Sequence, residues 1–293
     1  MQSTQDHHEE DLRSMRALLA LLGETANVVD FEEQIQLPGV RATLRLWQAA
    51  GALAAFAYVD EYNNLWFAVD ERLPHPDPVE EQIVAHAVER IRERNARNGT
   101  HDTLDYSCRS DATRQMRLME RHGFQPQPLR TLRYGRDLRQ PIPDIPLPAG
   151  YALRPARGEA EIDALVALHR AAFGTDQMTV DWRRAIMHAP QYVPELDLLA
   201  VAPDGQLAAF CVCGFDDPKH QAGYTDPIGT HVRHQGKGLG KAMLSAGLRA
   251  LQAAGAESAG LGTSSENIRM QKLAEALGFT LVSEKLWFSK EIP

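Results

Sequence analysis

The chain has 293 residues and a formal net charge of −8 at pH 7, with 44% hydrophobic and 24% charged residues. This length favours two domains, and the composition is that of an ordinary globular protein. The acidic balance excludes nucleic acid as a partner, because a phosphate backbone requires a basic face. No apolar stretch reaches the roughly 18 residues that a membrane span requires, so we expect no membrane partner.

The N-terminal end and the cysteines indicate the compartment. Residues 1–11 are polar and acidic, unlike a signal peptide. Cys211 and Cys213 are two residues apart in an apolar run, where both would point to one face of a strand, and Cys108 is the third cysteine. Such cysteines neither form a disulfide readily nor supply enough ligands for zinc. We therefore expect a cytoplasmic protein with reduced cysteines and no metal site.

In chain order, the first predicted elements are two strands joined by a turn at Gly51. Leu53–Phe56 reads Leu-Ala-Ala-Phe and is the second arm of this hairpin. A later segment, 114–124, ends in Gly-Phe and is followed by a closing strand over 132–138.

A proline-rich segment follows, and it separates the two halves of the chain. Its fixed φ angles and missing N–H donors exclude a helix or a central strand. The prolines are Pro141, Pro143, Pro146 and Pro148. We therefore predict an N-terminal domain over 1–138, a linker over 139–149 and a C-terminal domain over 150–293.

The second half is predicted as a single α/β unit. Strands alternate with amphipathic helices, and Asp204 and Gly205 give a turn between two of the strands. The predicted strands are 151–154, 196–202, 207–215, 224–232, 256–263 and 281–290, and the predicted helices are 162–173, 181–187, 241–251 and one that begins at Asn267.

The two halves are similar enough to be diverged copies of one unit. Leu207–Phe210 repeats the Leu-Ala-Ala-Phe of Leu53–Phe56, and both follow a glycine turn. Farther along, Arg114, Leu118, Glu120, Gly123 and Phe124 align without gaps to Arg269, Leu273, Glu275, Gly278 and Phe279. The sequence therefore predicts the same fold twice.

A run of glycines joins the predicted strand Ile228–Val232 to the predicted helix Lys241–Leu251. This run, Gln235–Gly240, reads Gln-Gly-Lys-Gly-Leu-Gly. Glycines at a helix entry let backbone N–H groups approach a ligand, and the helix dipole favours an anion there. Positive charge is supplied locally by Arg233, His234, Lys237 and Lys241. The ligand should therefore carry phosphates.

Two common phosphate motifs do not fit this run. A P-loop would need a glycine in place of Gln235 and a hydroxyl residue in place of Ala242. The dinucleotide fingerprint Gly-x-Gly-x-x-Gly fails because Lys241 or Met243 stands where its third glycine belongs.

The pattern that does fit is Gln/Arg-x-x-Gly-x-Gly/Ala, filled by Gln235, Gly238 and Gly240. A second segment, 267–279, is similar to Asn-x-x-Ala-x-x-Leu-Tyr-x-x-x-Gly-Phe at its asparagine, its leucine and its final Gly-Phe. With both segments in this order, the chain resembles the GNAT superfamily of acetyl-CoA-dependent N-acyltransferases. The resemblance implies an α/β fold of two tandem GNAT-like domains, each a mixed, mostly antiparallel sheet flanked by helices.

The resemblance also implies acetyl-CoA as the co-substrate. In GNAT proteins the strand before the loop pairs with the pantetheine amides, the loop holds the pyrophosphate, and an asparagine touches the cofactor arm. The matching positions are Ile228, Gly229, Thr230, His231 and Val232 on the strand, Gln235, Gly236, Lys237, Gly238, Leu239, Gly240 and Lys241 in the loop, and Asn267.

A general base is expected on the strand that leads into the loop. Asp226 is the only carboxylate on Tyr224–Val232, and alternation along the strand places Asp226 and Tyr224 on one side. Asp226 is therefore the candidate base, and an edge aspartate next to Pro227 is the structural alternative. Its reference pKa is about 3.9, so it acts directly only if burial raises that pKa, and otherwise acts through water or binds a cationic amine. His231 faces the other way and is expected to be structural.

The residue that should protonate the departing thiolate is missing. The resemblance places a tyrosine after the motif leucine, but the chain has Ala274 there and Met119 in the first half. Tyr224, Ser264 and Ser265 are candidate replacements, and protonation by water or a loss of catalysis are the alternatives. Because a thiol is a tolerable leaving group, the missing acid need not abolish turnover.

The first half keeps the scaffold but lacks the phosphate cradle. Its counterpart of the loop, between Phe67 and Gln82, has no glycine, three prolines and several carboxylates. Prolines remove N–H donors, and carboxylates repel phosphate. We predict a single acetyl-CoA site, in the C-terminal domain. The N-terminal domain would be a wall of the substrate cleft, a dimer surface or a cover for the second sheet.

The leading hypothesis is an N-acetyltransferase that acts on the primary amine of a small molecule, as a monomer or a homodimer. The tandem layout also resembles the mycothiol synthase family, which acts on an amino-sugar thiol conjugate. Aminoglycosides, polyamines and amino acids stay open as acceptors. The alternative is a non-catalytic acyl-CoA-binding or regulatory protein, which Ala274 and the first half without a cradle favour.

Overall fold

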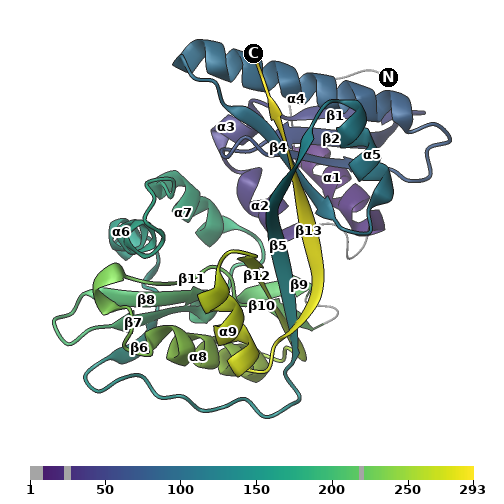
Figure 1. Ribbon diagram of the computed structural model, residues 1–293. Coiled ribbons are helices and arrows are strands. Elements are labelled where there is room, and N and C mark those ends of the chain that lie inside the picture. The colour runs from purple at the N-terminus through teal and green to yellow at the C-terminus, as the bar shows by residue number, and fades with distance from the viewer. Residues whose placement is uncertain (1–8, 23–27, 218–220) are drawn as a thin grey trace. The chain divides into compact units, whose positions relative to one another are not determined.

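The computed structural model describes residues 9–22, 28–217 and 221–293. The chain divides into two compact units: Met1–Arg130 together with Lys285–Pro293 form unit 1, and Thr131–Glu284 form unit 2. Two long strands, β5 (Gln125–Asp137) and β13 (Thr280–Glu291), each run from one unit into the other (Figure 1).

Unit 1 is built around a three-stranded antiparallel sheet in the order β1 (Arg45–Ala49), β2 (Ala52–Val59) and β3 (Leu65–Val69). The predicted hairpin is present, and its turn places Ala50 and Gly51 in the left-handed region, with φ of 51° and 79°. β2 is buried from Ala54 onward without alternation, as expected for a strand that is covered on both faces.

Helices and one further strand pair complete unit 1. The second half of β13 pairs antiparallel with β4, with Lys285 opposite Arg109 and Glu291 opposite Thr103. The elements are α1 (Glu9–Leu22), α2 (Val28–Gln34), α3 (Pro38–Arg41), α4 (Asp77–Asn98), β4 (Thr103–Arg109) and α5 (Thr113–Arg121). The core lies where α4, β2 and β4 meet.

Unit 2 has the predicted alternation of strands and helices. Its first strands and helices are β6 (Ala152–Pro155), α6 (Ile162–Phe173), α7 (Val180–His188), β7 (Asp197–Val201), β8 (Leu207–Val212) and β9 (Gly214–Asp217). Its later ones are β10 (Ala222–Tyr224), β11 (Ile228–Thr230), α8 (Leu239–Ala253), β12 (Ser258–Ser264), α9 (Ile268–Ala276) and the first part of β13. Short 3-10 turns cover 158–161, 194–196 and 232–234.

The strands of unit 2 form two ladders. One has the order β11, β8, β7, β6 and is antiparallel throughout. In the other, β12 pairs antiparallel with β5 and parallel with β10, which in turn pairs with β9. A mixed sheet flanked by helices is therefore confirmed for this half of the chain.

The predicted strand Tyr224–Val232 is divided in the structure. β10 ends at Tyr224 and pairs with β12, whereas β11 begins at Ile228 and pairs with β8. Pro227 has no N–H to donate to a neighbouring strand. Before it, the backbone pairs with β12, and after it, the backbone pairs with β8. The consequence is that the two ladders separate beyond Tyr224.

The closing strands are exchanged between the predicted domains. Residues 131–137 of β5 come from the first half but pair with β12 in unit 2, while 285–291 of β13 come from the second half and pair with β4 in unit 1. The repeat in the sequence divides the chain at the proline-rich segment, whereas the compact units divide it at Thr131 and again at Lys285. The functional domains at 1–138 and 150–293 stay a prediction.

The proline-rich segment lies along α8. Pro143 accepts a hydrogen bond from Ser245 through its carbonyl at 2.5 Å, and Asp144 pairs with Arg249. Ile142, Ile145 and Leu147 pack against the core of unit 2. The predicted linker is therefore part of that unit's wall. In the described ranges, no helix has the length and hydropathy needed to cross a membrane.

Candidate functional site

The candidate site begins at the opening between β11 and β12. The Pro227 carbonyl accepts from the Val212 N–H at 3.0 Å, and the His231 N–H donates to the Ala208 carbonyl at 2.9 Å. Residues 227, 229 and 231 thus direct their backbone groups toward β8, so those of Ile228 and Thr230 face the opening.

Some of the predicted strand positions face this opening, and others do not. Ile228 and the N–H of Thr230 face the space where a pantetheine arm is expected, whereas the Thr230 carbonyl accepts from Gln235 Nε2. Gly229 is packed instead, because a Cβ there would lie 2.6 Å from the Phe210 ring and 2.9 Å from Ala172. Val232 lies beyond the strand and is exposed.

The glycine loop leads from β11 into α8. Gly236 and Gly238 have φ of 76° and 85°, a conformation that favours glycine, and a Cβ at either position would meet nothing within 4 Å. At the start of the helix, the Ala242 N–H donates to the Gly238 carbonyl at 3.2 Å. In the described part of the chain, the N–H groups from 235 to 241 have no backbone acceptor. They form an open set of donors at a helix N-terminus, which suits an anion.

Gly240 has a packing role in the same loop. A Cβ at this position would lie 3.2 Å from a methyl group of Leu273, so the Leu273 side chain on α9 would have to shift to make room for it. Leu239 is buried at the helix start. The predicted loop residues are therefore of two kinds, with Gly236 and Gly238 open to a ligand and Leu239 and Gly240 fixing the helix.

The loop is held by a residue that sequence reasoning missed. The Tyr151 hydroxyl lies 2.8 Å from His234 Nδ1 and accepts a hydrogen bond from Lys237 Nζ at 3.3 Å. Gln235 Nε2 donates to the Thr230 carbonyl at 3.2 Å. Tyr151 is some eighty residues earlier in the chain, so no local pattern could have placed it beside the loop.

His231 caps a short turn, and its place in cofactor binding stays a prediction. Its Nδ1 accepts the Arg233 N–H at 3.1 Å and caps the short turn before the loop. Partial burial, with the positive charge of Arg233 and the neighbouring His234, lowers the pKa of His231. The ring is therefore kept neutral as an acceptor.

Asn267 lies at the start of α9 and caps it. Its Oδ1 accepts the Met270 N–H at 3.1 Å, which satisfies one of the unpaired donors of the first turn. The side-chain amide is exposed. A contact between Asn267 and a cofactor stays a prediction, since the capping bond uses only the oxygen.

Asp226 lies where the two ladders part. Its Oδ2 accepts the Gly262 N–H of β12 at 3.2 Å, and its side chain is exposed. The alternation that was expected to align it with Tyr224 is interrupted between β10 and β11, so that reasoning no longer applies. Tyr224 itself is buried, with its hydroxyl against Gly214.

Arg133 lies near Asp226, and Asp216 lies near Arg133. A Cβ built at Gly262 would be 3.2 Å from Asp226 Oδ2 and 3.8 Å from the Arg133 guanidinium. Arg133 also lies 3.9 Å from Asp216, whose pKa is raised by burial, with Arg133 acting in the opposite direction. Sequence reasoning missed Arg133 because it belongs to the exchanged strand β5, and it also missed Asp216 of β9.

The candidate acids have different surroundings. Ser265 is on the turn after β12, where its carbonyl accepts from Gln271 Nε2 at 3.0 Å. Ala274 is fully buried on the core face of α9, together with Leu277 and Phe279. The tyrosine position of the family is therefore filled by a packing residue.

The start of α4, the corresponding helix of unit 1, lacks the open N–H groups of the loop in unit 2. α4 begins after Pro76 and has Pro78 in its first turn, so donors are missing. Asp77 and Glu80 occupy the same turn and hold Arg114 of α5 at 2.7 and 3.0 Å. Carboxylates stand where unit 2 has open N–H groups.

Comparison with known proteins places the fold and the family of unit 2. A model of the acetyltransferase (GNAT) family matches residues 162–279. The mycothiol acetyltransferase of Kineococcus radiotolerans is 40% identical over 143 residues, which are 47% of this chain and 45% of that protein. That of Salinispora tropica is 36% identical over 151 residues, 49% of each chain. In both matches this chain spans about half the length of the relative.

Solved structures resemble a larger part of the chain. A GCN5-related N-acetyltransferase from Sphaerobacter thermophilus has a TM-score of 0.67 at 23% identity, covering 85% of this chain and 80% of that one. A tandem GNAT protein from the clavulanic acid biosynthesis pathway has a TM-score of 0.72 at 17% identity, covering 98% and 96%. At these identities the likeness shows the fold alone. Residues 162–279 therefore match the acetyltransferase (GNAT) family, within a chain that has the fold of a tandem GNAT protein.

Proposed function

We propose that unit 2 binds acetyl-CoA and transfers its acetyl group to the primary amine of a small molecule. The observation that carries the proposal is one continuous set of open backbone groups. It starts at the backbone groups of Ile228 and the N–H of Thr230 on the free edge of β11, where the Thr230 carbonyl already accepts from Gln235 Nε2, and it continues through the N–H groups from 235 to 241. The first part fits the amides of a pantetheine arm, and the second fits a pyrophosphate.

Bound acetyl-CoA would supply the thioester carbonyl that an amine attacks. Asp226 is placed at the divergence of the ladders to take the proton of the amine or to hold it as an ammonium ion. Asp216 adds a second carboxylate nearby, and Arg133 limits the net negative charge. An acceptor with a cationic amine is therefore favoured.

Two positions expected to protonate the departing thiolate do not supply a proton. Ala274 cannot donate, and the Tyr224 hydroxyl is buried against Gly214. Water protonates the thiolate in this proposal, and Ser265 stays a candidate. A thiol of ordinary pKa leaves without a general acid at moderate cost.

The first acceptor to test is mycothiol lacking its acetyl group, because two proteins that match about half of this chain are named mycothiol acetyltransferases. Those matches cover about half of each relative, so amino sugars, polyamines and amino acids belong in the same panel. A cytoplasmic location and a monomeric or homodimeric state remain predictions.

The second candidate is a non-catalytic acyl-CoA-binding or regulatory protein, which the buried Ala274 favours. Calorimetry with CoA, followed by a thiol-release assay with acetyl-CoA and the amine panel at pH 6–9, separates the two. Binding together with amine-dependent release of CoA supports the enzyme. Binding without release from any amine supports the regulatory protein, and no binding contradicts both.

A further inference from the structure

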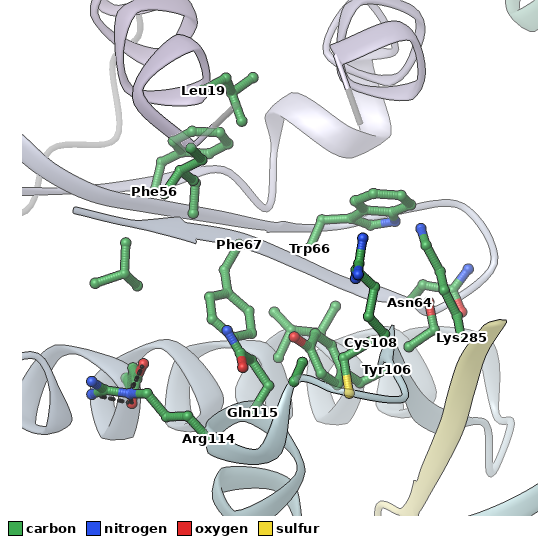
Figure 2. A pocket seen from close by; sticks show the side chains of 18 of the residues that line it. Leu19, Phe56, Asn64, Trp66, Phe67, Tyr106, Cys108, Arg114, Gln115 and Lys285 are labelled. Carbon is green, nitrogen blue, oxygen red and sulfur yellow. Dashed lines mark hydrogen bonds and ion pairs between the residues drawn. The ribbon is translucent and has the colours of Figure 1, made fainter. Parts of the chain in front are cut away.

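Unit 1 holds a cavity of about 710 Å³ that the proposed reaction does not use. All residues that line it lie within 19–115 or at Lys285 and Trp287, and so belong to unit 1. Its volume falls in the range of roughly 300–1,000 Å³ that is typical of small-molecule pockets. The cavity surrounds the outer edge of β3 (Figure 2).

The pairing of β3 with β2 determines which backbone groups of β3 face outward. The Asp60 N–H donates to the Asn64 carbonyl at 3.0 Å, and the Asp70 N–H donates to the Ala54 carbonyl at 2.8 Å. In an antiparallel pair, alternate residues direct both backbone groups to the partner strand. Even-numbered residues of β3 therefore face β2.

The odd-numbered residues face the gap toward β4. In the described ranges, β4 meets this edge at the bridge between Asn64 and Asp105, after which the two strands diverge. Phe67 and Val69 come after the bridge. The N–H and carbonyl of Phe67 and the N–H of Val69 are thus presented to the cavity without a strand partner.

Apolar walls lie on both faces of this edge. On one face, Trp66 stacks on Tyr58 with ring centroids 6.3 Å apart. On the other, Phe67 points from β3 toward Tyr106 and Gln115, and the Phe67 and Tyr106 rings stack at 5.3 Å (Figure 2). An extended molecule along the edge would place successive side groups into alternate walls.

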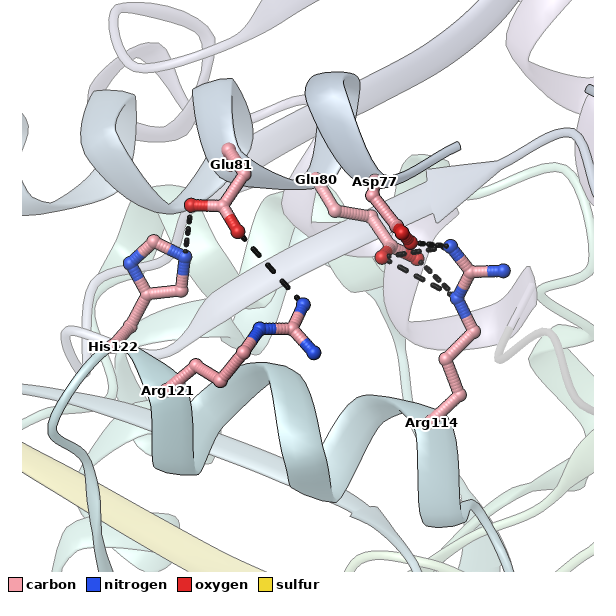
Figure 3. A network of polar contacts seen from close by, with 6 residues as sticks. All are labelled: Asp77, Glu80, Glu81, Arg114, Arg121 and His122. Carbon is pink, nitrogen blue, oxygen red and sulfur yellow. Dashed lines mark hydrogen bonds and ion pairs between the residues drawn. The ribbon is translucent and has the colours of Figure 1, made fainter. Parts of the chain in front are cut away.

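The lining carries no net charge. Its acids are Glu71, Glu80 and Asp111, and its bases are Arg109, Arg114 and Lys285. Arg109 pairs with Asp111 at 2.7 Å, Arg114 pairs with Glu80 at 3.0 Å, and Lys285 Nζ lies 5.8 Å from the centre of the Trp66 ring, so five of these six already have a partner within the protein. Figure 3 shows Arg114 held between Asp77 and Glu80 of α4. The carboxylates at this helix start disfavour a phosphate.

We infer that unit 1 is a binding site for a short, uncharged, peptide-like molecule with apolar or aromatic side groups. Its amides pair with the free backbone groups of Phe67 and Val69, as in the addition of a strand to a sheet edge. Its side groups enter the walls formed around Trp66 and Tyr106. The site is separate from the acetyl-CoA site of unit 2 and does not depend on the acyl-transfer proposal.

The test uses the full chain and the eight blocked tripeptides, N-acetylated and C-terminally amidated, in which each position is Leu or Phe. Calorimetry should find at least one that binds once per chain with a Kd below about 100 µM. Methylation of the central amide nitrogen of that peptide should weaken its binding at least about tenfold, because the methyl group replaces an N–H that would donate to the edge of β3. No binding by any of the eight, or equal binding by the methylated form, overturns the inference.

Two variants locate the site. Ala112→Trp places a large ring in the cavity wall at the start of α5 and should raise the Kd of the best tripeptide at least about tenfold. Ala96→Trp, on the exposed side of α4, is the matched control and should leave the Kd within about twofold. Thermal melts check that both variants fold. Equal affinity for both variants places the peptide elsewhere and contradicts the inference.

A CoA titration separates this inference from the proposed function. Gly238→Glu, directed at the loop of unit 2, should leave tripeptide binding unchanged even where CoA binding is lost. If CoA instead binds twice per chain, and the tripeptide displaces one of the two, the cavity is a CoA site and the inference is wrong.

Discussion

Asp226 is the side chain on which the proposed chemistry depends most. It is exposed, accepts the Gly262 N–H at 3.2 Å and lies where β10 and β11 separate. Arg133 is its charged neighbour, and Asp216 lies 3.9 Å from Arg133. A carboxylate in this position can accept a proton from an amine or hold the protonated amine near the thioester.

Asp226→Asn should lower kcat at least about tenfold and leave the Kd for CoA within about threefold. The amide oxygen can still accept from Gly262, so only the charge and the basicity are lost. The matched control is Asp204→Asn, because Asp204 also accepts a backbone N–H, from Gln206 at 3.0 Å, but in a hairpin turn. A normal rate in Asp226→Asn would make this aspartate a structural residue.

His169 gives unit 2 a pH-dependent stability. Its ring packs against Phe173 and Phe210, with centroids 4.7 and 5.6 Å away, and its Nδ1 is buried without a partner among the described residues. Burial, with the charge of Arg183, lowers its pKa to about 4. The unfolded chain, with an ordinary pKa near 6.5, therefore binds a proton first as the pH falls.

The stability of the protein should thus decrease as the pH falls from about 6.5 toward 4. After allowing for the partial exposure of the ring, we expect a loss of about 1 kcal/mol between pH 7.5 and pH 5. His169→Phe, which cannot be protonated, should lack this part of the loss. Urea denaturation of both proteins at the two pH values is the measurement. Equal losses in both would show that another group titrates.

At the scale of elements, the start of α4 shows how unit 1 closes the place of a phosphate cradle. Glu80 is 5% exposed and pairs with Arg114 of α5, which is about half exposed. Removing the arginine would leave a buried carboxylate without its cation. Arg121 of the same helix pairs at 3.8 Å with Glu81, and both of these are exposed.

Arg114→Leu should therefore lower the free energy of unfolding by about 2 kcal/mol, a value reduced from that of a fully buried pair. Arg121→Leu, the control on the same helix, should cost less than about 1 kcal/mol. Urea denaturation measures both. A similar cost for the two variants would show that the Glu80 pair is not the one that joins α4 to α5.

The elements of unit 2 could largely be predicted from periodicity, as α6 at Ile162–Phe173 illustrates. The division at Thr225–Pro227 could not, because an apolar run with one Asp-Pro has the pattern of a single strand. A local pattern also identifies a strand without identifying its partner. The exchange of β5 and β13 was therefore missed, and with it the place of Arg133 in the candidate site.

At the scale of the whole molecule, the exchange determines which fragment can fold. β12 pairs with 131–137 of β5 along one full edge, from Ser258 opposite Asp137 to Ser264 opposite Thr131. A fragment over 150–293, the predicted domain, lacks this strand and exposes the edge of β12. A fragment over 131–284 keeps it.

The fragment 131–284 should fold and bind CoA within about threefold of the full chain, whereas 150–293 should be unfolded or aggregated. Circular dichroism and calorimetry are the measurements. If 150–293 alone folded and bound CoA, the domains predicted from the repeat would be the folding units, and the pairing of β5 with β12 would not be needed for stability.

The most direct test of the central claim, that the loop before α8 holds the pyrophosphate of CoA, is a CoA titration of Gly238→Glu. The control is Gly255→Glu at the other end of α8. Both glycines have left-handed φ, 85° and 96°, with nothing within 4 Å of a Cβ, so the backbone strain and the added charge are matched. Calorimetry should detect no CoA binding by Gly238→Glu, while Gly255→Glu should bind CoA within about twofold of the unaltered protein. A Kd for Gly238→Glu within about threefold of the unaltered value, roughly 0.65 kcal/mol, would contradict the central claim.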